Sequence, residues 1–310
     1  MIMRKLISFL FFAGMVLMTT IASAQDYAFR VLANKGTNQV KKAGAGTAES
    51  LKTGAKLNSG DEIITSEDAY IGLMHSSGKT TEIRGGGTKK ISDIEKTITT
   101  GSTSIASRYA SFVMNKMNEE ENTNNRSKLN ATGAVSRATG SAAINVMAPS
   151  QADLLGDIAI LRWSAPEGFV AGDSYIVKIE NIFNEEIYSE ETSKGSITLD
   201  FSDEALAYDM GLYLVKVYKK GDDEIASGEV GIKKVKSGDK VEIQENLANL
   251  KSEVSDDSPL NKIIYASFYE ENGLILDALT KYEEAIKMSP EVEDFQELYT
   301  NFLIKNGLAQ

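Results

Sequence analysis

The stretch PLNKIIYASFYEENGLILDALTKYEEAIKMSP, residues 259–290, carries the strongest structural signal in this chain. Its small residues Ala266, Ala278 and Ala285 recur where two successive helices would cross. Small side chains at a crossing let two helix backbones approach closely, and neighbouring tyrosines can fill the flanking volume. The stretch therefore predicts two short antiparallel helices packed face to face.

The ends of these helices also have sequence signals. Ser-Pro pairs at 258–259 and 289–290 are typical of a helix N-cap followed by a proline in the first turn. The Asn-Gly pair at 272–273 supplies a residue that accepts left-handed backbone between the two helices. These boundaries agree with the spacing of the alanines.

The same spacing resembles a known repeat family. Counted from Pro259, the alanines fall at positions 8, 20 and 27, and Tyr269 and Tyr282 at positions 11 and 24. This order resembles the tetratricopeptide (TPR) family, whose unit has about 34 residues. Residues 293–305 repeat part of the pattern and predict a third helix that covers the exposed face. About one repeat is present, so an ordinary amphipathic hairpin packed on the preceding domain stays open as the alternative.

The TPR resemblance implies a protein partner bound on the concave face of the helices. The residues expected to contact it are Lys262, Tyr265 and Tyr269, with Tyr269 alternatively placed wholly in the core. A further helix is expected over 240–254, so that residues 239–310 form a TPR-like helical region.

Residues 25–115 are expected to form a small all-β domain with a trailing helix. Alternating residues at 70–74 and 80–83 flank the turn Ser77-Gly78, which is typical of a β-hairpin. The glycine before Leu57, a Gly-Asp turn at 60–61 and the strand that ends in threonine resemble the FecR-type domain. The three glycines at 85–87 are interpreted as a turn and not as a phosphate-binding loop.

A second β region is expected over 149–238, after a polar segment, residues 116–148, interpreted as a flexible linker. About seven short strands, Trp163 at the end of an early strand and Tyr213 at the start of a late one resemble an immunoglobulin or fibronectin type III sandwich. Trp163 is expected to anchor the core. The predicted fold class is therefore multidomain and mostly β, with a helical C-terminal region.

The first residues predict export. Arg4 and Lys5 precede an apolar run from Leu6 to Met18, and small residues follow at 22–24. This order predicts a cleavable signal peptide over 1–24. No later stretch reaches the about 18 apolar residues of a membrane span, so no transmembrane segment is expected in the mature chain. The expected location is the periplasm of a Gram-negative bacterium, with secretion or surface display left open.

The charges are spread unevenly. Residues 25–115 carry 12 Lys and Arg against 9 Asp and Glu, a net charge of +3, whereas residues 150–310 carry 15 against 32, a net charge of −17. Phosphates would be repelled by the acidic part, which argues against nucleic acid as its partner. The first domain would not repel an acidic envelope polymer.

Signals for catalysis or metal binding are weak. The chain has no cysteine and a single histidine, His75, so a conventional zinc site or a histidine-based nucleophile pair cannot form. A loose calcium turn at 222–224 and a carboxylate-only hydrolase are the remaining options. The hydrolase would be favoured if the acids of the first domain met in one cleft. Those acids are Asp61, Glu62, Asp68 and Glu82. No cofactor is expected.

These observations favour a non-enzymatic exported adaptor. Its FecR-like domain would bind an envelope component, and its TPR-like helices would bind an envelope protein or peptide. The FecR resemblance also implies an alternative, the periplasmic ligand-sensing part of a signalling system. An enzyme acting on envelope polymers is a third, less favoured option.

Overall fold

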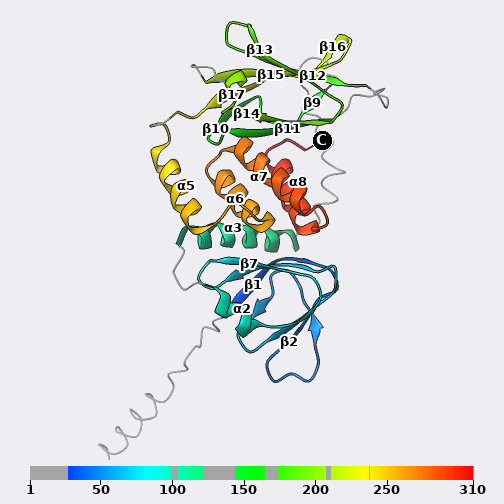
Figure 1. The fold of residues 1–310 in the computed structure, drawn as a ribbon, viewed down its shortest axis with the longest axis vertical. Coiled ribbons are helices and arrows are strands. Elements are labelled where there is room, and N and C mark those ends of the chain that lie inside the picture. Colours follow the sequence, from blue (N-terminus) through cyan, green and yellow to red (C-terminus); the bar gives the residue numbers. More distant parts are fainter. Residues whose placement is uncertain are drawn as a thin grey trace, which may run out of the picture.

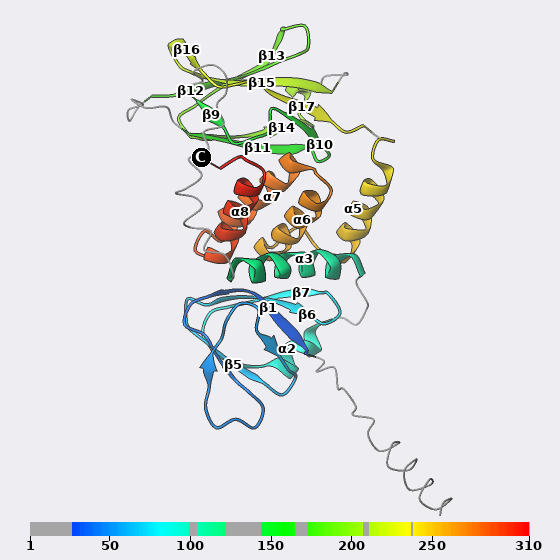
Figure 2. The same cartoon turned by 180° about the vertical axis from the view of Figure 1, so that it is seen from behind.

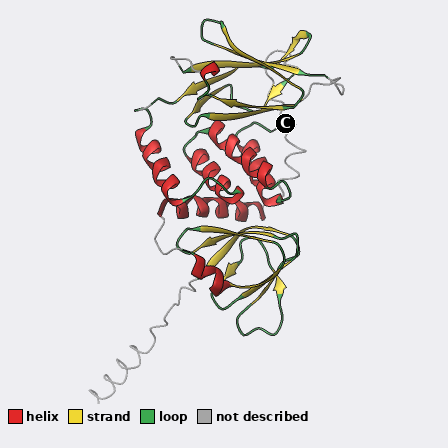
Figure 3. Cartoon of the chain, in the orientation of Figure 1, coloured by secondary structure: helices red, strands yellow, loops and turns green. Residues whose placement is uncertain are grey.

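The helices occupy the middle of the molecule, between two β-rich parts (Figures 1 and 2). Figure 3 shows the same order by secondary structure, with a helical layer separating two sets of strands. The computed structural model describes residues 27–98, 104–121, 144–164, 173–206, 211–236 and 238–309. The layout is mixed and multidomain, and the expected signal peptide lies outside the described residues.

The first β part contains two four-stranded antiparallel sheets. One has the order β4-β1-β6-β7 and the other β3-β2-β5-β8. The strands are β1 (Phe29–Lys35), β2 (Gln39–Lys41), β3 (Glu49–Ser50), β4 (Lys56–Leu57), β5 (Glu62–Thr65), β6 (Tyr70–His75), β7 (Thr80–Arg84) and β8 (Gly87–Lys90), followed by helix α2 (Ile91–Thr97). The hairpin expected around Ser77-Gly78 is confirmed, since β6 pairs with β7 from Tyr70↔Arg84 to Met74↔Thr80.

The second β part contains a six-stranded and a three-stranded sheet. The larger has the order β10-β17-β15-β12-β13 with β16 on β15, and the smaller β14-β11-β9. The strands are β9 (Asn145–Val146), β10 (Gln151–Leu154), β11 (Ile158–Ser164), β12 (Tyr175–Glu180), β13 (Glu186–Thr192), β14 (Ser196–Asp200), β15 (Leu212–Lys219), β16 (Asp222–Ala226) and β17 (Val230–Lys234), with a short 3₁₀ turn at Glu204–Leu206. Trp163 is buried, as expected for a core anchor.

The helices agree closely with the spacing signals. They are α3 (Ser104–Glu121), α5 (Val241–Glu253), α6 (Pro259–Glu271), α7 (Ile275–Met288) and α8 (Glu293–Lys305). The Ser258 side chain caps α6 by accepting a hydrogen bond from the Asn261 N–H, and Gly273 has left-handed backbone with φ of 69°. Ala266, Ala278 and Ala285 are all completely buried, as close helix packing requires.

Helix α3, which follows the first β domain in the chain, also packs on α6 and α5. Two expectations about boundaries are corrected. Ser289 is the C-cap of α7, not an N-cap, because α8 begins only at Glu293. The segment 116–148 is not wholly a linker: its first residues continue α3 to Glu121 and its last include β9, while 122–143 lie outside the described residues.

The helical layer packs on the first β part through the outer face of the β1–β6–β7 sheet. A Cβ added at Gly72 would lie 3.2 Å from the Leu260 side chain, so α6 approaches this sheet closely. Glu82 accepts a hydrogen bond of 3.1 Å from the Leu260 N–H at the start of α6. On α8, the half-buried Asp294 carboxylate accepts a hydrogen bond of 2.8 Å from the Asn34 N–H. Polar and apolar contacts therefore both hold this junction.

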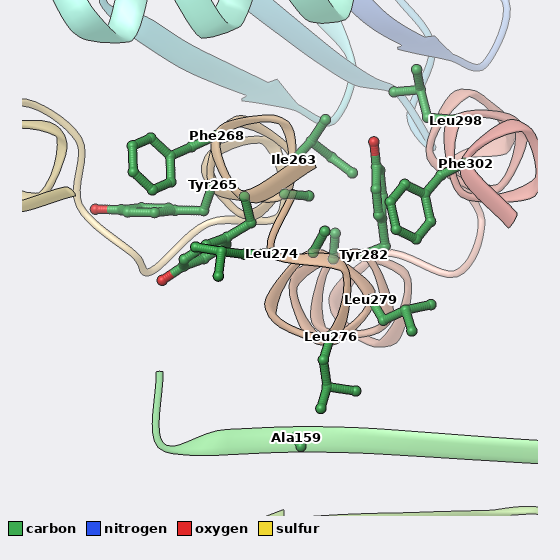
Figure 4. Close-up of a cluster of buried hydrophobic side chains, with 14 of the residues drawn as sticks. Ala159, Ile263, Tyr265, Phe268, Leu274, Leu276, Leu279, Tyr282, Leu298 and Phe302 are labelled. Carbon is green, nitrogen blue, oxygen red and sulfur yellow. The ribbon is translucent and has the colours of Figure 1, made fainter. Parts of the chain in front are cut away.

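On its other side the layer packs on β11 through α7. Figure 4 shows Leu276 of α7 extending toward Ala159 of β11. Beyond this apolar contact, Thr280 accepts a 3.0 Å hydrogen bond from the Ile160 N–H. The Arg162 guanidinium donates two hydrogen bonds, of 2.7 and 2.6 Å, to the two oxygens of Glu283. Strand β9 pairs with β11 only at Trp163 and Ser164, so α7 covers the edge that β9 leaves free.

Replacing Gly156 by alanine tests how tightly α7 is docked on the second β part. The added Cβ would lie 2.9 Å from Asp277 Oδ1, so we expect Gly156→Ala to lower the free energy of unfolding by about 1–3 kcal/mol. Gly228→Ala is the control, because no atom lies within 4 Å of its added Cβ. Urea unfolding monitored by circular dichroism compares the two. Equal midpoints for both variants would contradict this docking.

Candidate binding pocket between the helices and the second β part

A polar pocket of about 290 Å³ opens where α5, α6 and α7 meet the loop between β10 and β11. Its lining includes two of the three residues expected to bind a partner, Tyr265 and Tyr269. The other lining residues are Gly156, Asp157, Ile158, Lys251, Asp256, Asp277, Thr280, Lys281 and Glu284. Hydroxyls and charges dominate this set, so the pocket is suited to a polar group.

The expected open face is nevertheless occupied by the chain itself. Tyr265 is 2% exposed and Tyr269 is 4% exposed, because the second β part and α5 pack around them. A broad concave surface for a partner polypeptide is therefore not available at these residues. What remains of it is the pocket, whose volume suits a single side chain or a small polar molecule.

The two tyrosines differ in their hydrogen bonding. The Tyr265 hydroxyl donates a 2.6 Å hydrogen bond to the Val254 carbonyl, which ties α6 to the end of α5. The Tyr269 hydroxyl forms no hydrogen bond with any residue in the described part of the chain. Its pKa is raised, first by burial and then by the negative charges of Asp277 and Asp256. Of the two tyrosines, Tyr269 is therefore the one whose hydroxyl can form a hydrogen bond with a ligand.

Lys262 lies beside the pocket in a network of alternating charges. Its Nζ is 3.0 Å from Asp256 and 2.6 Å from Glu284, and Lys281 pairs with the same two carboxylates at 2.7 and 2.9 Å. Burial, the largest single influence, lowers the pKa of Lys262, but Glu284 and Asp256 together outweigh it and hold the pKa above its ordinary value. This network holds the wall of the pocket in place, and the Lys262 ammonium is already paired with Asp256 and Glu284.

Asp277 forms the floor where α7 meets the second β part. Its carboxylate accepts hydrogen bonds from the N–H groups of Leu155 at 2.9 Å and Gly156 at 2.6 Å. Burial raises the pKa of Asp277 to about 6, against these two hydrogen bonds, which lower it. Because this carboxyl is 3% exposed and its pKa is about 6, a ligand in the pocket can change its ionisation.

The acids of the first β part do not meet in one cleft. Asp61 is buried and accepts hydrogen bonds from the N–H groups of Asn58 and Ala43. Asp68 is exposed and pairs with Lys35, and Glu82 caps α6. Over the described ranges, no group of three or more acidic, histidine or cysteine side chains is arranged to hold a metal ion. The acids at 222–224, expected in a turn, all lie within strand β16.

Comparison with known proteins adds no family assignment. A scan against protein-family models gives no match for this chain, and a search of curated proteins gives none either. Of the helices that the structure describes, none is both long enough and apolar enough to cross a bilayer.

Sequence reasoning found the tyrosines but missed Asp277, Thr280 and Glu283. These residues recur every three positions on α7, which is one face of a helix. Polar residues at that spacing usually mark a solvated face. Here they contact backbone N–H groups and Arg162 of the second β part. The only signal was a polar stripe inside an otherwise apolar hairpin.

The paired tyrosines give a matched test of the pocket geometry. We expect Tyr265→Phe to lower the free energy of unfolding by about 1 kcal/mol, because the hydrogen bond to the Val254 carbonyl is lost. Tyr269→Phe is expected to change it by less than about 0.5 kcal/mol, since its hydroxyl has no partner among the described residues. Chemical denaturation of both variants measures the difference. Similar losses would show that Tyr269 is bonded within the protein.

The raised pKa of Asp277 predicts a pH dependence. Its ordinary value is 3.8, so between about pH 4 and 6 the folded protein holds a proton that the unfolded chain has lost. The contribution of this group to the free energy of unfolding therefore falls as the pH rises through that window, by about 3 kcal/mol in total.

Asp277→Asn removes this titration. Wild-type stability relative to the variant should therefore decrease from pH 4 to pH 7. Urea titrations at several pH values measure this difference, and parallel pH profiles for the two proteins would contradict the shift.

Proposed function

We propose that this protein is a non-enzymatic exported adaptor in which a helical block holds two β domains in a fixed relation. One observation carries the proposal: the helices make polar contacts with both β parts, through Asp294 on one side and Glu283 on the other. Binding surfaces at the two ends of such a molecule keep their separation and orientation, which is what an adaptor between two partners needs.

The proposal includes the resemblance of the three parts of the chain to known families. Burial of the three hairpin alanines supports a TPR-like unit. The Tyr213 hydroxyl donates a 2.8 Å hydrogen bond to the Leu206 carbonyl, a contact typical of the tyrosine corner in immunoglobulin-like sandwiches. The β6–β7 hairpin supports the FecR-like domain. Export rests on the signal-peptide pattern of residues 1–24.

At the helices, the proposed partner is bound through a small pocket and not along a peptide-binding groove. The pocket beside Tyr269 can admit one inserted side chain of a partner protein, and the free hydroxyl of Tyr269 would bond to it. The first β domain engages the envelope component. Under this proposal the helices mainly act as a rigid connector.

Point variants test the adaptor role better than truncation, because removal of residues after 240 would strip α7 from β11. The mature chain is immobilised and exposed to solubilised envelope. Lys251→Glu reverses a charge at the rim of the pocket, and Lys287→Glu makes the same change at an exposed site on α7 that does not line it. We expect Lys251→Glu to reduce recovery of a protein partner by tenfold or more and to leave the envelope component bound.

The adaptor proposal also requires both partners in one complex with the wild-type chain. Equal recovery of all components by wild type, Lys251→Glu and Lys287→Glu would remove the role proposed for the pocket. Recovery of the two components only in separate complexes would contradict the adaptor role itself.

A further inference from the structure

The first β domain is open along one side. The two sheet orders end at β7 and at β8, and among the described residues neither strand has a second partner. These strands follow each other in the chain and are joined only through Gly85 and Gly86, yet they belong to different sheets. Two free strand edges therefore border the same opening.

The hydrogen-bond pattern shows which backbone groups face outward on β8. Ile91 donates to the Asp61 carbonyl just beyond the paired residues. Because bonded and non-bonded pairs alternate along antiparallel strands, Lys89 and Gly87 are then bonded to β5. The N–H and C=O groups of Thr88 and the N–H group of Lys90 point away from β5, and no described residue bonds to them. The Lys90 carbonyl is engaged, because Lys90 is the N-cap of α2 and its carbonyl accepts the first hydrogen bond of that helix.

The same reasoning applies to β7. Hydrogen bonds from the His75 N–H to the Lys79 carbonyl and from the Gly85 N–H to the Ala69 carbonyl bracket the hairpin. Thr81 and Ile83 are therefore bonded to β6, and alternate residues of β7 present their backbone groups outward. Those residues are Thr80, Glu82 and Arg84.

A groove of about 640 Å³ lies between these edges. Ile83 and Ile94 line it, together with Thr81 and Thr88. An extended peptide rises about 3.3 Å per residue and alternates its side chains between two faces. Such a peptide can place one set of side chains on the isoleucines while its backbone pairs with a free edge.

The charges available in the groove are positive. Lys89 and Lys90 line it and form no ion pair with any residue in the described ranges. The two acids of the lining are already engaged: Glu82 accepts from the Leu260 N–H and Asp93 pairs with Lys96 at 2.8 Å. An acidic occupant is therefore the one whose charge complements the groove.

We propose that the groove between β7 and β8 binds an extended acidic peptide, which adds as a strand to the free edge of β8. This inference rests on the proposed function and gives the envelope component its chemistry, a polypeptide segment with alternating acidic and apolar residues. The outward backbone groups occur at alternate residues of the strand, which is the spacing at which another strand pairs. This favours a polypeptide over an acidic polysaccharide, because a polysaccharide has no matching row of amide donors and acceptors.

The test uses the mature chain and four probes: a peptide of alternating glutamate and valine, the same peptide N-methylated at alternate residues, an alternating lysine and valine peptide, and oligogalacturonate as the acidic polysaccharide. Calorimetry gives affinities and hydrogen exchange followed by NMR reports on backbone protection. We expect the glutamate peptide to bind and to slow exchange of the Thr88 and Lys90 amides. N-methylation or charge reversal should weaken binding at least tenfold.

Two variants separate charge from backbone pairing. Lys89→Glu with Lys90→Glu removes the charge complement, and Thr88→Pro removes one outward N–H that β5 does not use. Each should weaken the glutamate peptide at least tenfold, while Lys41→Glu, at an exposed position on β2 outside the groove, should not.

Unchanged binding after N-methylation, tighter binding of oligogalacturonate, or no binding of the glutamate peptide would each overturn the proposal. Because no envelope extract is used, failure here leaves the adaptor role to be judged by its own test.

Discussion

The docking of α7 on β11 is the constraint on which the rest of the molecule depends. Asp277, Thr280 and Glu283 lie on one helix face and are buried against the second β part. A buried carboxylate is costly unless hydrogen-bond donors satisfy it. Two backbone N–H groups satisfy Asp277, and the bidentate guanidinium of Arg162 satisfies Glu283. A shift of one residue along α7 would leave these groups without donors, so only one register is stable.

This docking merges the helices and the second β part into one core. The same apolar cluster extends through α3 to the outer face of the first sheet, where it reaches Leu32 and Tyr70. The interior of the first β domain is a separate cluster around Phe29 and Ile63. The first domain thus has its own core, whereas the second β part and the helices share theirs. The α6–α7 hairpin, too small to be stable alone, obtains its neighbours from the same chain.

Local patterns predicted much of the secondary structure. Spacing and turn residues predicted the helix bounds, the β6–β7 hairpin, and the burial of Trp163 and of the three alanines. Each of these features depends on contacts within a few residues or within one hairpin. Ser289 was misjudged because a serine before a proline suits either end of a helix. The candidate site was predicted only in part: Tyr265 and Tyr269 line the pocket, but their face is covered.

The sequence by itself determined the elements and which of their faces are apolar, since propensity, capping and periodicity act locally. Only the tertiary structure decided what covers each face. A helix with small residues and tyrosines can pack against a partner protein or against another part of its own chain, and the choice depends on distant donors such as Gly156 and Arg162. The open edge of β8 likewise became visible only in three dimensions, because a strand does not reveal along its own residues which of its two edges will find a partner.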